Sequence, residues 1–379
     1  MAIRSSELAA ARSSLSRRVD IQALAGLSLM LGFGAAFLAV AGVFLDRALL
    51  AFIDDSGAAG LLWMLGTVVF AWLAFRCLSW LAVVNGPPEG VELPRDAARS
   101  LYRLVDRVGA RFGSARIDSV WVTGGMNAAI QQRPRWGLVG PMQSHLLIGL
   151  PLAHSVNERQ LVAIVAHEFA HLAYQRQGLG AWGCHLRAWW FRALTRCLDE
   201  LPVWLSESLE RQTERSLVLA QELARLEEFE ADRAAARVVG RGLVGEALTE
   251  VALKERFLAE DYWEKVMAQS TVLPRPSIRP YREMGLGMAA GFRASTEQSN
   301  AFLRSTFADP DEGDGLHPTL AERLDALGVV PIGPRAEERS AAARHLRGVL
   351  PRLSWIFDRV WWMETRMSWR HHYRSSRRR

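Results

Sequence analysis

Two long apolar segments dominate the hydrophobic pattern of the chain. The first, residues 21–45, contains no charged side chain, and the second, residues 61–84, contains only Arg76. Each is longer than the about 20 residues that cross the hydrocarbon core of a bilayer. The pattern therefore predicts two transmembrane helices within an N-terminal membrane anchor, residues 1–90.

Two alternatives explain the same segments differently. The first segment resembles a secretory signal peptide, with residues 39–41 as its cleavage site, and both segments resemble buried helices of a soluble protein. The first segment is long for the apolar region of a signal peptide. Two such segments in succession are also unusual for a soluble core, so two spans are the favoured interpretation.

The charges flanking the spans predict their orientation. The connecting loop contains three aspartates against Arg47, whereas four arginines precede the first span: Arg4, Arg12, Arg17 and Arg18. Basic residues stay on the cytoplasmic side of a membrane. We therefore expect a multi-pass protein of the inner (cytoplasmic) membrane, whose catalytic domain, after Asn85, faces the cytoplasm.

Residues 85–94 form a Pro- and Gly-rich linker. After it, some stretches show the hydrophobic spacing of a helix and others that of a strand. Residues 96–112 have helical spacing, whereas 117–123, 127–132 and 145–152 suit strands, the second of them an edge strand. The predicted fold class is α+β, mostly helical, with a small sheet. We place one domain at 91–330 and a C-terminal segment at 331–379.

The chemically most informative motif is His167-Glu168-Phe169-Ala170-His171, an H-E-x-x-H pattern. It lies in an apolar helical stretch, residues 156–173, which Ser155 and Glu158 introduce as a capping box. Histidines four apart share one helix face and can bind one Zn²⁺, and Glu168 is then placed as the general base. The alternative is a core helix with two hydrogen-bonded histidines.

A catalytic zinc site needs a third protein ligand, and a second acidic helix offers one. The stretch 206–239, ended by Gly240, carries Glu228 and Asp232 one turn apart. We assign Glu228 to the metal and Asp232 to the outer N–H of a ligating histidine, His167. The alternative is a solvated acidic face that pairs with neighbouring arginines.

Together these motifs resemble the integral-membrane zinc endopeptidases of the HtpX and CAAX prenyl protease type. Two further segments match that family's pattern: His317-Pro318 followed by Arg323, and Asn127-Ala128. The resemblance implies a gluzincin, with one Zn²⁺ per chain in a zincin-type catalytic domain. It also implies that substrate pairs with the strand at Asn127 and Ala128, and that unfolded or membrane proteins are the substrates, in membrane protein quality control.

The roles of His317 and Arg323 are open at this level. A hydrogen-bonding or cationic side chain near zinc could stabilise a tetrahedral oxyanion. The resemblance favours a position near the active site for both residues without fixing their roles. From the residues alone, His317 and Pro318 cap a helix and Arg323 pairs with an acidic neighbour.

The chain departs from HtpX-type relatives in the segment 178–205, because charges interrupt every apolar run there. The segment suits an amphipathic helix that lies on the bilayer or covers the cleft, or a helical hairpin of the soluble domain. The three cysteines form no C-x-x-C pair, which argues against a disulfide framework and against a cysteine zinc site.

Tryptophans and arginines alternate in the C-terminal segment, from Trp355 to Arg379. This composition suits the headgroups of an anionic lipid bilayer, and we favour that partner over nucleic acid. We expect deletion of residues 355–379 to preserve peptidase activity while weakening attachment to anionic liposomes.

The sequence thus predicts a membrane-anchored zinc metalloendopeptidase. The alternatives are a non-catalytic zinc-binding membrane adaptor and a maturation protease for one lipidated substrate. A structural zinc site has four protein ligands. The three ligands and one general base found here therefore favour a catalytic zinc site. The sequence carries no signal for an oligomeric state.

Overall fold

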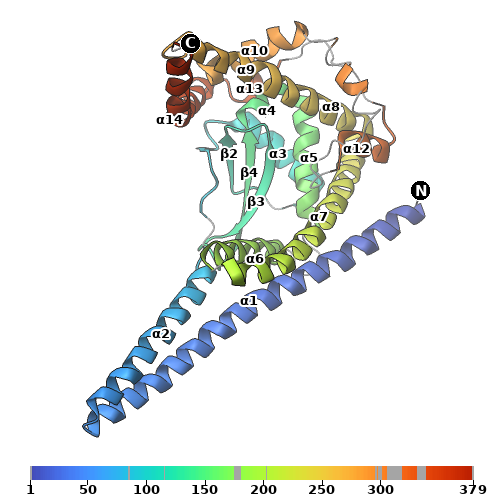
Figure 1. Cartoon of the computed structure of the whole chain (residues 1–379). Coiled ribbons are helices and arrows are strands. Elements are labelled where there is room, and N and C mark those ends of the chain that lie inside the picture. Colours follow the sequence, from blue (N-terminus) through green and yellow to red (C-terminus); the bar gives the residue numbers. More distant parts are fainter. Residues whose placement is uncertain are drawn as a thin grey trace. The chain divides into compact units, whose positions relative to one another are not determined.

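The computed structural model describes residues 2–83, 86–114, 116–174, 181–201, 203–294, 297, 301–304, 318–330 and 339–377 (Figure 1). Contacts divide the chain into two compact units. Unit 1 comprises residues 1–86, 133–141 and 175–224, and unit 2 comprises 87–132, 142–174 and 225–379. The units differ from the predicted domains because later segments return to the N-terminal helices, and because residues after 330 pack within unit 2.

Unit 1 is built on a helical hairpin of α1 (Ala2–Ile53) and α2 (Gly57–Leu81), both apolar and long enough to cross a membrane. The turn between them places Asp55 at φ +59°. Aromatic rings hold the hairpin together, among them Phe44 and Trp63, whose centroids lie 5.2 Å apart. Most of the other large apolar side chains are exposed in the isolated chain, as lipid-facing residues are.

Within the segment 178–205, residues Ala181–Glu200 form α6, which packs against α1 and α2 within unit 1. Trp189 donates its indole N–H to the carbonyl of Leu81 at 2.8 Å. Glu200 accepts a hydrogen bond from Arg76 at 2.6 Å. The charge in the second predicted span therefore has a partner on α6, and the described part of the segment belongs to unit 1, with the two apolar helices, and not to unit 2.

Unit 2 contains a four-stranded mixed sheet in the order β1-β2-β4-β3. The strands are β1 (Val91–Leu93), β2 (Ser119–Thr123), β3 (Ala128–Pro134) and β4 (Met142–Gly149). β1 pairs antiparallel with β2, and β2 pairs parallel with β4, which leaves β3 at an edge as predicted. The prediction missed β1, which is short and lies in the proline-rich linker. Residues 150–152, predicted as strand, begin a helix instead.

Helices make up most of the rest of unit 2 (Figure 1). They are α3 (Arg99–Arg111), α4 (Leu150–Ser155), α5 (Glu158–Tyr174), the second part of α7 (Val203–Val239), α8 (Arg241–Phe257), α9 (Trp263–Ala268), α10 (Pro280–Ala294), α12 (Leu320–Leu327), α13 (Ala341–His345) and α14 (Leu350–Ser376). A π-turn, η1 (Leu258–Tyr262), and a 3₁₀ turn, η2 (Gln269–Thr271), flank α9. The chain is thus mostly helical with a small sheet.

The helix that carries the H-E-x-x-H motif, α5, lies in the core of unit 2. Phe169 is buried against α3, where a side chain on Gly109 would lie 2.8 Å from the Phe169 ring. The capping box lies two residues later than predicted: Asn157 and Gln160 exchange the two side-chain-to-backbone hydrogen bonds, at 2.9 and 3.0 Å. Ser155 instead ends α4, where its hydroxyl donates to the carbonyl of Pro151.

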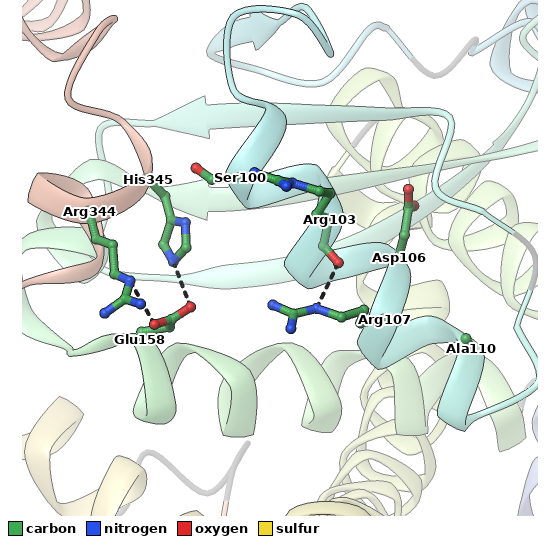
Figure 2. Close-up of a pocket in the computed structure, with 8 residues that line it drawn as sticks. All are labelled: Ser100, Arg103, Asp106, Arg107, Ala110, Glu158, Arg344 and His345. Atoms are coloured by element: carbon green, nitrogen blue, oxygen red, sulfur yellow. Dashed lines mark hydrogen bonds and ion pairs between the residues drawn. The ribbon is translucent and has the colours of Figure 1, made fainter.

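Glu158 has a different partner from the one predicted (Figure 2). Its carboxylate pairs with Arg344 of α13 at 2.7 Å, beside a hollow of about 760 Å³ between α3, α5 and α13. The backbone N–H of Ala341 donates to the carbonyl of Val156 at 2.8 Å. α13 therefore fixes the start of α5, about 14 Å along the helix axis from His167.

The C-terminal helix α14 is part of unit 2 and not a separate segment. Trp369 is fully buried, and its indole N–H donates to the carbonyl of Leu273 at 2.9 Å. Phe357 is also buried, and Trp361 stacks on Trp263 with ring centroids 6.1 Å apart. Deletion from Trp355 onward would remove these core side chains, so such a deletion would affect the folding of unit 2 as well as any attachment to lipid.

Candidate metal centre

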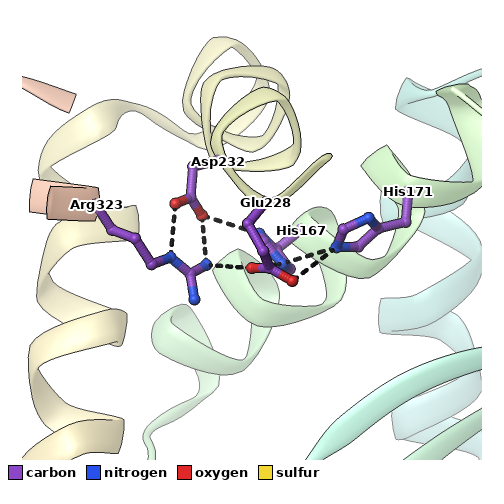
Figure 3. Close-up of polar contacts among 5 residues, drawn as sticks. All are labelled: His167, His171, Glu228, Asp232 and Arg323. Atoms are coloured by element: carbon purple, nitrogen blue, oxygen red, sulfur yellow. Dashed lines mark hydrogen bonds and ion pairs between the residues drawn. The ribbon is translucent and has the colours of Figure 1, made fainter. Parts of the chain in front are cut away.

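Two helices bring three possible metal ligands together (Figure 3). His167 and His171 of α5 place their Nε2 atoms 3.1 Å apart. Oε2 of Glu228 on α7 lies 3.4 Å from Nε2 of His167, and its other oxygen, Oε1, lies 3.6 Å from Nε2 of His171. These are the three residues that the sequence nominated as ligands.

The three side chains are close enough together to bind one small ion. Ligand atoms about 2.1 Å from a zinc ion lie about 3.4 Å from one another at the tetrahedral angle. The two histidine nitrogens are 3.1 Å apart, and the nearest Glu228 oxygen to each of them lies 3.4 and 3.6 Å away, so the distances are in the range of that value. Two imidazoles and a carboxylate are also a donor set that zinc accepts, with a fourth position left for water or substrate. The residues present therefore fit a zinc ion.

A second layer of contacts orients the ligands. Nδ1 of His167 lies 2.9 Å from Oδ1 of Asp232, which is one helical turn after Glu228 on α7. An acceptor at Nδ1 leaves Nε2 of His167 free to face the metal position. This is the arrangement that the sequence predicted for Asp232.

Arg323 of α12 completes this layer (Figure 3). Its guanidinium donates two hydrogen bonds to Asp232, at 2.7 and 2.8 Å, and lies 3.2 Å from Glu228. Thr319 caps α12 in a capping box with Glu322. Arg323 thus pairs with acidic neighbours, and those neighbours belong to the candidate site. His317 lies outside the described residues.

The charges of the cluster shift its proton equilibria. Burial by itself would lower the pKa of His167, but hydrogen bonds to Asp232 and Glu228 outweigh it and raise that pKa to about 9. Burial raises the pKa of Glu168, against the opposing effect of the two histidines. In the protein without metal, His167 therefore carries a proton that a metal ion would displace.

Glu168 lies beside the ligands in a pocket of about 390 Å³. Its carboxylate accepts a hydrogen bond from the backbone N–H of Ile130 on the edge strand β3. Asn127 and Ala128, nominated for substrate binding, line the same pocket. The open edge of β3 is therefore turned toward the candidate base.

The wall opposite β3 was not foreseen from the sequence. It is formed by one face of α8, with Val244, Ala247, Leu248 and Val251. Their spacing of three, four and seven residues is typical of an amphipathic helix and could have been recognised. The pocket therefore combines a polar, charged floor with an apolar side.

Comparison with protein-family models, curated proteins and solved structures finds no match for this chain. The argument for function consequently depends on the motifs and on the geometry of the site.

Proposed function

We propose that this chain is a membrane-anchored, zinc-dependent endopeptidase. The observation that carries the proposal is the close grouping of His167, His171 and Glu228 beside the partly buried carboxylate of Glu168. Zinc, when bound, would polarise the scissile carbonyl and make water acidic enough to lose a proton near neutral pH. The resemblance to HtpX-type peptidases supports the same assignment.

The side chains then have distinct roles. Glu168 accepts the proton of the attacking water and later gives it to the leaving amine nitrogen. Asp232 keeps His167 in the tautomer and orientation that a ligand needs. Arg323 neutralises Asp232 and part of the charge on Glu228, which makes it a positioning residue unless substrate reaches it.

The pocket suits an extended polypeptide as substrate. An edge strand can pair with a peptide backbone, and β3 turns its open edge toward Glu168. The apolar face of α8 offers space for a side chain of the substrate. Unfolded segments of membrane proteins have an extended backbone and apolar side chains. We therefore propose a quality-control role at the inner membrane, with unit 2 in the cytoplasm.

The direct test is cleavage of casein by the detergent-purified full chain, with zinc content measured on the same samples. Glu168→Gln should retain about one zinc per chain and lose cleavage, because the substitution removes the base and keeps all three ligands. Glu228→Gln should lose both zinc and cleavage. Glu227→Gln is the matched control, since Glu227 precedes Glu228 and is not among the cluster's ligands.

The outcomes separate the competing functions. Zinc bound by both the wild type and Glu168→Gln, with cleavage by neither, would support the zinc-binding adaptor. Cleavage of a prenylated peptide together with refusal of plain peptides would support a dedicated maturation protease. Absence of zinc from the wild type would remove the proposal altogether.

A further inference from the structure

The net charge of the chain is concentrated in its last 30 residues. Residues 350–379 contain eight arginines, one aspartate and one glutamate, which gives a net charge of +6. The whole chain also has a net charge of +6, so the other 349 residues are balanced, with 38 basic and 38 acidic side chains. Half of this surplus, +3, belongs to α14 and half to the three arginines that follow it in the sequence, so the C-terminal end of the chain suits a polyanionic partner.

The arginines share one exposed face of α14 with large apolar side chains. At 3.6 residues per turn, the face covers an arc of about 140°. Its apolar members, Trp355, Val360, Met363 and Met367, are 55%, 39%, 50% and 68% exposed. Its exposed basic members are Arg352, Arg359, Arg366, Arg370, Arg374 and Arg377.

The opposite face of α14 is already used by the fold. Trp369 and Phe357 are buried there, and Trp361 stacks on Trp263. The exposed arginines and methionines are therefore not needed to hold α14 in unit 2. In this respect they differ from Trp361 and Trp369, whose rings pack within unit 2.

A hollow of about 340 Å³ continues this face toward α10. Three arginines line it, Arg275 and Arg279 from the loop before α10 and Arg359 from α14, together with the exposed ring of Trp355. Asp358 lies there too, but it accepts a hydrogen bond from the backbone N–H of Tyr281 at 2.8 Å. Three guanidinium groups around an aromatic ring suit a phosphate joined to an apolar chain.

We propose that this face of α14, with the adjoining hollow, binds the surface of an anionic phospholipid bilayer. Arginines attract the phosphate and carboxylate groups of such a surface, while exposed Trp, Val and Met side chains enter the boundary between headgroups and acyl chains. A nucleic-acid backbone would use the arginines only and leave the methionines in water. The two membrane spans proposed above would also hold the face near a bilayer at high local concentration.

The test uses the full chain in phosphatidylcholine nanodiscs and measures its flotation with added vesicles. Vesicles of phosphatidylcholine alone are compared with vesicles that also contain phosphatidylserine. Each arginine near an anionic surface contributes about fivefold to binding, so Arg359→Gln/Arg366→Gln/Arg370→Gln should bind about a hundredfold more weakly. The matched control, Arg99→Gln/Arg103→Gln/Arg107→Gln on exposed positions of α3, removes the same charge elsewhere.

Selective flotation with the anionic vesicles that the α14 variant loses and the α3 variant keeps would support the proposal. Met363→Ser/Met367→Ser should also weaken binding, which a purely ionic contact would not predict. Equal loss in both triple variants, or displacement of the vesicles by duplex or single-stranded nucleic acid at lower concentration, would overturn it. No peptidase measurement enters this test, so the outcome is independent of the proposed catalysis.

Discussion

Among the residues that orient the candidate metal ligands, replacement of Arg323 should lower the stability of the protein most. Its guanidinium makes two hydrogen bonds of 2.7 and 2.8 Å to Asp232 and approaches Glu228 at 3.2 Å. The side chain of Arg323 is 17% exposed and that of Asp232 is 2% exposed. Arg323→Met would leave buried charge without its partner, which costs about 3–5 kcal/mol of unfolding free energy.

Two comparisons make this prediction specific. Arg323→Lys keeps the charge but loses the two-pronged geometry, so it should destabilise the protein less than Arg323→Met does. Arg344→Met breaks an ion pair of similar length, 2.7 Å, whose side chains are 59% and 26% exposed. That control should cost only about 0–1 kcal/mol, because water screens exposed pairs.

The assay is urea unfolding of the zinc-free protein in detergent, followed by titration of zinc against a competing chelator. Loss of a partner that orients a ligand also lowers metal affinity, by about 10- to 100-fold. If Arg323→Met and Arg344→Met proved equally stable and bound zinc equally well, the argument that burial makes the Arg323–Asp232 pair structurally important would fail.

Three further predictions concern pH, the substrate pocket and the core. The carboxylate partners of His167 raise its pKa to about 9, from 6.5 in the unfolded chain. The protonated His167 therefore stabilises the fold fully below pH 6.5, and this stabilisation is lost as the pH rises through about 9. The urea midpoint of the zinc-free protein should fall across this pH range. Ala247→Phe adds bulk to the apolar wall, so the cleavage sites in casein, identified by mass spectrometry, should shift toward smaller side chains; an unchanged site pattern would show that substrate does not contact α8. Trp369→Ala should cost about 3–5 kcal/mol and Trp355→Ala less than about 1, by the same urea assay, because only Trp369 is buried.

The elements with strong local signals were predictable from the sequence. The apolar segments, the helix ended by Gly240 and the H-E-x-x-H helix all correspond to helices in the structure. His167 and His171 needed only the helical period to be placed on one face. Glu228 and Asp232 needed the same period, but their position beside α5 was inferred from the third ligand that a catalytic zinc site requires, and not from local pattern.

Contacts between distant segments were not predictable in the same way. Nothing near Arg323 in the sequence indicates whether its partner is Asp325, two positions on, or Asp232, which is 91 positions away. The capping box was misplaced because Ser155 and Asn157 both suit an N-cap, and only the short helix α4 before them decides between the two. The tryptophans of α14 looked like membrane residues because composition does not show which face of a helix is buried.

The balance of charge in the candidate site is itself an argument about its metal. Three carboxylates, Glu168, Glu228 and Asp232, surround the cluster, and Arg323 is the cation among its pocket-lining residues. Two negative charges then remain, and in the metal-free protein the raised pKa of His167 compensates one of them with a proton. A divalent cation that displaces this proton would supply both charges at once. Among divalent ions, two imidazoles and a carboxylate in a tetrahedral arrangement favour zinc over magnesium or calcium, which prefer oxygen ligands and higher coordination numbers.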